Sequence, residues 1–112
     1  MATQEDSGTA DVTLDTPMTL FTSSATPADK SYGAKIDTEQ MVAGDRVVIT
    51  VKTKSISTAT VQIVINDILT DAQDIPQWYL PPIFSPHASG FILIVEQTDG
   101  TARDFNWSVF SV

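Results

Sequence analysis

Hydrophobic and polar residues alternate along several short stretches of this chain. In residues 46–54, Val47, Ile49 and Val51 occupy alternate positions, and threonine and lysine side chains occupy the opposite set. Successive side chains of a β-strand point to opposite faces, so this pattern predicts a strand with one buried face.

The alternation recurs between clusters of turn-forming residues. Residues 58–68 place Val61, Ile63 and Ile65 on the face that we expect to be buried. Further strands are predicted by the same reasoning. They cover residues 12–15, 18–23, 32–37, 91–98 and 103–112.

The helical period of 3.6 residues is missing, apart from one predicted helical turn over residues 38–45 that ends at Gly44. The predicted class is all-β. Short strands with this spacing are typical of an antiparallel β-sandwich, and we expect a jelly-roll-like one. Residues 1–10 are small and polar and predict a flexible N-terminal tail. The length favours a single domain over residues 11–112.

Residues 71–90 interrupt the strands with Pro76, Pro81, Pro82 and Pro86. Proline removes a backbone donor and fixes φ, which argues against a helix or a central strand. Long connections without regular structure are uncommon in compact domains and are usually functional or disordered. We predict a long loop that packs on its own domain or on a partner through its hydrophobic side chains. These are Trp78, Tyr79, Leu80, Ile83 and Phe84.

Asp99-Gly100 lies between the last two predicted strands and is a strong hairpin signal. With a two-residue turn, Ile94 lies opposite Phe105. With a three-residue loop the pairing shifts by one residue, which exchanges the face of one strand relative to the other. The sequence leaves both registers open.

Residues 91–95 are hydrophobic at every position, a pattern typical of strands covered on both faces. Ile92 and Ile94 are therefore predicted to form apolar surface beyond what one core can bury. Further out-of-phase apolar residues are Val48, Val64, Phe110 and Val112. Either the loop at 71–90 or another protein covers this surface, and both alternatives stay open.

Fourteen acidic residues against six basic ones give a formal net charge of −8. This balance argues against nucleic-acid binding, which depends on a basic surface. The acids are scattered, which favours a role in solubility. The absence of cysteine excludes disulfides and thiolate metal sites. With no signal-like segment and no membrane-length apolar run, we expect a soluble protein that starts at Met1 and has no membrane partner.

Two groups of residues raise the question of metal or catalytic chemistry. Asp67, Asp71 and Asp74 could hold a hard cation, but their spacing is not that of an EF-hand and acids beside turns are usually turn formers.

His87 lies close in sequence to Ser85 and Ser89 and could be a catalytic base, but sequence neighbours do not make a triad. We expect no enzyme activity, no metal and no cofactor.

Trp78 and Tyr79 could stack on a sugar, as in carbohydrate-binding β-sandwich modules. They could equally fill the end of the sandwich or anchor a protein interface, where aromatic residues are enriched. We favour protein contact over sugar contact.

Three segments resemble small structural proteins of tailed bacteriophages. They are IDTEQMVAGDRVVITVKTKS (36–55), YLPPIF (79–84) and VEQTDGTARDFNWSVFSV (95–112). Similar small β proteins, some of them jelly rolls, decorate capsids and staple major capsid protein subunits on the outside of the shell. The resemblance implies contact surfaces rather than catalytic residues.

Our hypothesis is a capsid decoration or cement protein, made in the host cytoplasm and located on the exterior of the phage head. We expect it to bind the major capsid protein and to form a homodimer or homotrimer. The candidate interface residues are Trp78, Tyr79, Leu80, Ile83, Phe84, Ile92 and Ile94. The alternatives are a tail, baseplate or fibre-associated structural protein and a carbohydrate-binding module.

Overall fold

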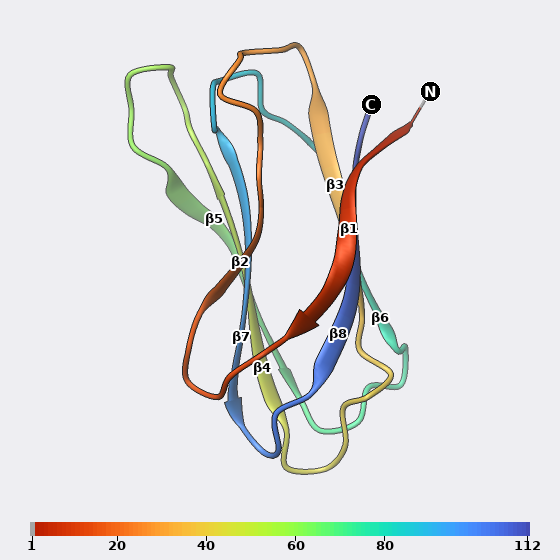
Figure 1. Cartoon of the computed structure of the whole chain (residues 1–112). Coiled ribbons are helices and arrows are strands. Elements are labelled where there is room, and N and C mark those ends of the chain that lie inside the picture. Colours follow the sequence, from red (N-terminus) through yellow and green to blue (C-terminus); the bar gives the residue numbers. More distant parts are fainter. Residues whose placement is uncertain (1) are drawn as a thin grey trace.

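Two antiparallel four-stranded sheets lie face to face in the computed structural model, which describes residues 2–112 (Figure 1). Sheet A has the order β1-β8-β3-β6, and sheet B has the order β2-β7-β4-β5. The strands are β1 (Thr3–Asp11), β2 (Met18–Thr22), β3 (Ser31–Asp37), β4 (Arg46–Thr53), β5 (Gln62–Thr70), β6 (Gln77–Phe84), β7 (Phe91–Asp99) and β8 (Asp104–Ser111). No helix occurs within residues 2–112. The predicted all-β antiparallel sandwich is confirmed.

The chain crosses from one sheet to the other at nearly every connection. Only β4 and β5 follow each other within one sheet. Strands far apart in sequence therefore become neighbours: β1 pairs with β8, and β2 pairs with β7. This order is jelly-roll-like, as the sequence predicted. The start of β1 and the end of β8 lie at the same end of the sandwich (Figure 1).

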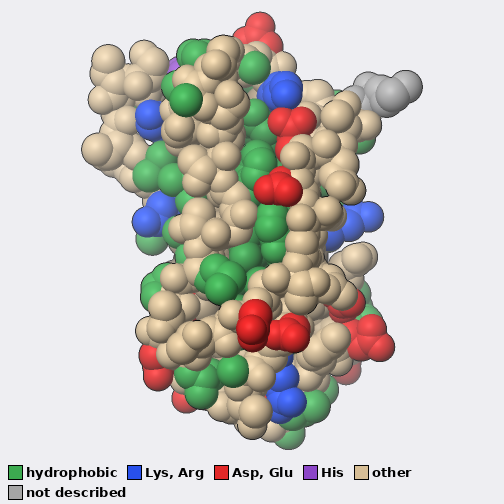
Figure 2. Space-filling view, viewed as in Figure 1, with side chains coloured by type: hydrophobic (Ala, Val, Ile, Leu, Met, Phe, Trp, Pro, Cys, Tyr) green, Lys and Arg blue, Asp and Glu red, His purple; other side chains and the backbone are tan. Residues whose placement is uncertain are grey.

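The core lies between the sheets and is built from alternate residues of each strand. Val47, Ile49 and Val51 of β4 are fully buried, which confirms the face predicted for this strand. They meet apolar side chains from the inner face of sheet A, among them Ile36 and Phe105. Figure 2 shows hydrophobic side chains along the middle of the view, between the edges of the two sheets.

The prediction of a flexible tail over residues 1–10 is wrong for the described part. Residues 3–11 form β1, which pairs with β8 over its whole length. Ala10 is the one buried side chain of this strand. β1 is held by backbone pairing at the edge of sheet A, so its sequence carries no apolar alternation to reveal it.

The prediction of a continuous loop over residues 71–90 is also wrong, because its middle forms β6. This strand lies at the edge of sheet A, where a missing N–H can face away from the neighbouring strand. Pro81 and Pro82 occupy an irregularity in the pairing with β3, opposite Gly33. The prolines thus excluded a central strand, as argued, but not an edge strand.

The predicted hairpin at Asp99-Gly100 does not form. β7 belongs to sheet B and β8 to sheet A, so neither of the two registers exists. Gly100 has φ 91°, in the left-handed region that favours glycine. The residues that follow carry the chain across the sandwich rather than back along β7.

Three smaller expectations need correction. Residues 38–45 form turns without a helix, although Gly44 does have the positive φ expected of a chain reversal. Residues 12–15 also form a turn instead of a strand. In β5 an irregularity at Val64 changes the phase, so that Ile63 points outward while Ile65 packs against the core.

Candidate functional site

The predicted interface residues are divided between the core and the surface. Trp78 and Leu80 are buried between the sheets, and Ile83 packs against the same core. The Trp78 indole N–H donates to Asp67 Oδ2 at 2.8 Å. This bond joins β6 at the edge of sheet A to β5 at the edge of sheet B, so Trp78 closes one side of the sandwich.

Tyr79 and Phe84 point outward from β6. Their exposed fractions are 51% and 63%. Alternation along the strand explains the division, because Trp78 and Leu80 share the inner face and Tyr79 lies between them. Of the aromatic side chains proposed from residues 71–90, these two are therefore accessible to a partner.

Ile92 and Ile94 lie on the outer face of sheet B. They alternate along β7 with Phe91, Leu93 and Val95, which are fully buried. Both isoleucines are half-buried and lie outside the core cluster. Their cross-strand neighbours on this face are Lys52 and Thr50 of β4 and Thr22 and Thr19 of β2.

Three rows of directly opposed residues cross this outer face. Ile68, Val48 and Glu96 form the first; Asn66, Thr50, Ile94 and Thr19 form the second; Ile63, Lys52, Ile92 and Thr22 form the third. Opposed residues in an antiparallel sheet share a face, so these side chains form one surface. We call its apolar members the sheet B apolar patch. They are Val48, Ile63, Ile68, Ile92 and Ile94.

The sheet B apolar patch is open to solvent at its β5 side, where Ile63 and Ile68 are 57% and 52% exposed. Strand spacing and rise give a face of four eight-residue strands an area of about 500 Å². That area also includes the threonines, Asn66, Lys52 and Glu96 of the three rows, so the sheet B apolar patch occupies only part of it. A contact between two such faces would bury about 1,000 Å² in total, at the low end for a specific interface.

The outer face of sheet A has a different composition. Tyr79 and Phe110 lie there with their rings at 13° to each other and their centroids 6.2 Å apart. Phe110 lies over Gly33, where any Cβ would meet the ring. Glycine at this position therefore allows the ring to lie against the sheet. Lys35 Nζ is 5.9 Å from the centroid of the Tyr79 ring.

Two adjoining hollows open on this face. One, of about 510 Å³, is lined by Ala2, Lys35, Gln77, Tyr79 and Phe110. The other, of about 240 Å³, is lined by Lys35, Asp37, Gln77, Asn106, Trp107 and Ser108. Because both share Lys35 and Gln77, an aromatic surface continues directly into a polar one.

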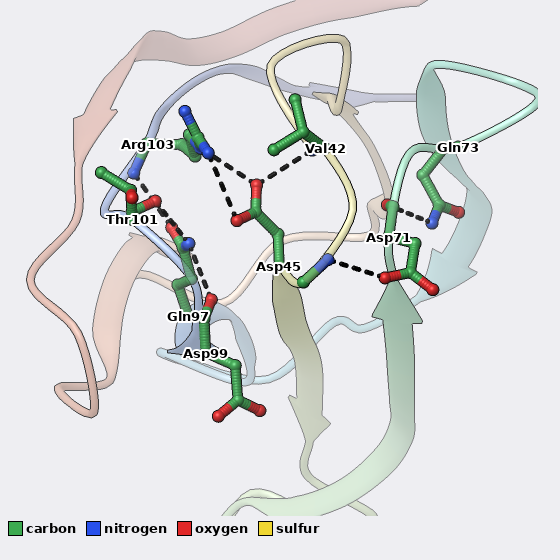
Figure 3. Close-up of polar contacts among 9 residues, drawn as sticks. Val42, Asp45, Asp71, Gln73, Gln97, Asp99, Thr101 and Arg103 are labelled. Atoms are coloured by element: carbon green, nitrogen blue, oxygen red, sulfur yellow. Dashed lines mark hydrogen bonds and ion pairs between the residues drawn. The ribbon is translucent and has the colours of Figure 1, made fainter.

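A polar cluster at one end of the sandwich ties several connections together (Figure 3). The fully buried Gln97 side chain donates to the carbonyl oxygens of Asp99 and Thr101, and it accepts from the Arg103 N–H at 3.0 Å. These bonds fix the path by which the chain leaves β7 and enters β8. Sequence reasoning missed Gln97, because nothing in the pattern distinguishes it from an exposed glutamine.

Asp45 is the charged centre of this cluster. Arg103 Nε donates to Asp45 Oδ2 at 2.9 Å, and the Val42 N–H donates to the same oxygen at 3.0 Å. Burial raises the pKa of Asp45, but the hydrogen bonds from Val42 and Arg103 outweigh it and hold the pKa below its ordinary value. The cluster is thus satisfied within the chain and stabilises the fold.

The acids considered as cation ligands have separate structural roles. Asp67 accepts from Trp78, and Asp71 accepts from the Gly44 N–H at 2.8 Å on another connection. Across residues 2–112, no three His, Asp or Glu side chains lie close enough together to hold a metal ion. The structure therefore does not bring Asp67, Asp71 and Asp74 together.

The residues considered for catalysis also have structural contacts. The buried Ser85 hydroxyl donates to the Gly90 carbonyl at 2.8 Å, and the Gly90 N–H donates to the His87 carbonyl. Ser89 adopts a positive φ in the same turn. These contacts close the β6–β7 connection.

Comparisons with protein-family models, with curated proteins and with solved structures find no match for this chain. Within the described part of the chain, there is no helix of the length and hydropathy needed to cross a membrane. The inference about function therefore depends on the two outer sheet faces.

Proposed function

We propose that the chain is a non-enzymatic virion protein that decorates the exterior of a phage head and binds the major capsid protein. The observation that carries the proposal is the sheet B apolar patch, which the fold leaves outside its core. The jelly-roll order supports it as well, since this architecture is common among viral capsid and lectin domains.

The sheet B apolar patch is the proposed surface for self-association as a dimer or trimer. Its rows contain few charges, Lys52 and Glu96, and several threonines, so little desolvation of charge opposes contact. A single contact of about 1,000 Å² gives a weak complex. A decoration protein can make several such contacts at once. When one contact holds the protein on the capsid lattice, the effective concentration for forming the next contact is higher, and the overall binding is stronger.

Phe84 is the proposed anchor toward the shell. It is an exposed aromatic side chain on β6, an edge strand of sheet A. Aromatic side chains are the usual anchors of protein interfaces. It lies on the other sheet from the sheet B apolar patch, so one molecule can contact both a copy of itself and the capsid protein.

The test starts from purified phage shells that lack this protein. Wild type, Ile94→Asp and Ser7→Asp are each added to separate samples, and the shells are then sedimented. Ser7 is exposed on β1 in sheet A, so its variant adds the same charge on the opposite sheet. We expect wild type and Ser7→Asp to sediment with shells and to self-associate in light scattering. We expect Ile94→Asp to lose self-association and to bind shells at least about tenfold more weakly.

Copy number in purified particles provides the second measurement. A decoration protein is present in a fixed ratio to the major capsid protein. A few copies per particle would overturn the proposal in favour of a tail, baseplate or fibre position. A strict monomer that fails to bind shells would overturn it altogether.

A further inference from the structure

The outer face of sheet A presents two aromatic rings that the core does not use. At 13° and 6.2 Å between centroids, the rings of Tyr79 and Phe110 are nearly parallel but displaced sideways. Lys35 Nζ lies 5.9 Å from the centroid of the Tyr79 ring, so a ligand would use the part of the ring that Lys35 does not cover. Tyr79 is 51% exposed, so its ring would bury substantial area if a partner packed against it. We call this pair the aromatic platform.

Neutral hydrogen-bonding groups surround the aromatic platform. Gln77 lines both hollows, and Asn106 and Ser108 line the smaller one. The Asn106 carbonyl oxygen accepts from the Thr9 hydroxyl at 2.7 Å, which orients the side chain and leaves its NH₂ group as a donor. Amide and hydroxyl groups of this kind can donate to and accept from ligand hydroxyls.

Charge identifies the class of occupant. The lining of the two hollows contains one cation, Lys35, and one carboxylate, Asp37. The platform is therefore close to neutral within a chain of net charge −8. A polyanion such as a nucleic acid finds no basic surface here. A partner helix that binds through an apolar face needs a groove lined by apolar side chains, and the lining of these two hollows is mixed.

We propose that the aromatic platform and its polar hollow bind a neutral glycan. One apolar face of a pyranose ring packs on Tyr79 and Phe110, while the sugar hydroxyls bond with Gln77, Asn106 and Asp37. This arrangement follows the general design of ligand sites, in which apolar surface supplies affinity and a few polar groups supply orientation. The site lies on a different sheet from the sheet B apolar patch and does not depend on the proposed role on a capsid.

The test is an NMR titration of the purified chain with three neutral hexasaccharides, namely cellohexaose, maltohexaose and mannohexaose. Polygalacturonate serves as an acidic glycan and decaproline as a peptide that also packs on aromatic rings. We expect at least one neutral hexasaccharide to shift the backbone signals of Tyr79, Phe110 and Asn106. Tyr79→Ala should weaken its binding about tenfold or more.

Phe84→Ala is the matched control, because it removes an exposed aromatic side chain from the same strand outside both hollows. It should leave glycan affinity unchanged. The proposal is overturned if no neutral hexasaccharide shifts these signals at millimolar concentration, or if both alanine variants weaken binding equally. Binding of decaproline alone would also overturn it and would identify the platform as a peptide site. Shell sedimentation of Tyr79→Ala should match wild type, which separates this site from the proposed capsid contacts.

Discussion

Arg103 and Asp45 form an ion pair across the end of the sandwich, with Nε 2.9 Å from Oδ2 and Nη2 3.4 Å from Oδ1 (Figure 3). The two residues are 58 positions apart in sequence. Asp45 ends the connection from β3 to β4, and Arg103 ends the connection from β7 to β8. The pair therefore holds together two crossings of the chain between the sheets.

Asp45→Asn should destabilise the protein, because the amide removes the negative charge that Arg103 and the Val42 N–H bind. The Asp45 side chain is 1% exposed, whereas Arg103 keeps 26% exposure and can recover some hydration. We expect a loss of about 2 kcal/mol in the free energy of unfolding, measured by urea denaturation at neutral pH. Asp74→Asn, at an exposed site, should change it by less than about 0.5 kcal/mol. Equal effects from the two variants would contradict the assigned role of the pair.

Stability should fall in acid through Asp45. The pKa of this carboxyl is lower in the folded chain than its ordinary value of 3.8. The unfolded chain therefore binds the proton more tightly, and the stabilisation is complete above pH 3.8 and lost as the pH falls through the lower folded value. The difference in unfolding free energy between wild type and Asp45→Asn should shrink over this range. A difference that stays constant down to pH 2 would contradict the lowered pKa.

Gly44→Ala and Gly100→Ala form a matched pair, because the two glycines have φ values of 92° and 91°. A Cβ at Gly44 meets nothing within 4 Å, so the cost is backbone strain of about 1 kcal/mol. A Cβ at Gly100 would collide with the Asp45 carboxylate and lie 3.0 Å from its Cα. We expect the second variant to lose about 3 kcal/mol, again measured in urea. Similar losses in both variants would show that the contact with Asp45 can relax.

Asp104→Asn should stabilise the protein at neutral pH. A hydrogen bond with Asp11 and the charge of that residue raise the pKa of Asp104 in the folded state. The folded chain therefore binds the proton more tightly than the unfolded chain, and the repulsion is present above the raised pKa and relieved below it. An asparagine amide can donate to Asp11 at every pH. The midpoint of thermal unfolding should rise at pH 7, and the gain should disappear in acid. A lower midpoint at pH 7 would contradict the repulsion.

The class of fold was accessible from sequence because period-two alternation is a local property. Val47, Ile49 and Val51 alternate with polar residues, and burying them requires only that a strand lie on a core. The apolar run also predicted side chains on both faces of β7, and the structure has Ile92 and Ile94 half-buried on the face opposite the core. Strand β1 escaped detection because its backbone pairing carries no side-chain pattern.

Which strands pair with each other was decided only in the tertiary structure. Asp99-Gly100 has the local chemistry of a hairpin, yet the buried bonds of Gln97 and the ion pair of Asp45 with Arg103 direct the chain to the opposite sheet. Likewise, the sequence brought attention to Tyr79, but its neighbour on the aromatic platform is Phe110, from a distant strand. Alternation determines which side chains share a face of one strand. The order of strands depends on long-range contacts, and that order decides which faces meet, which stay open and which residues stand side by side on them.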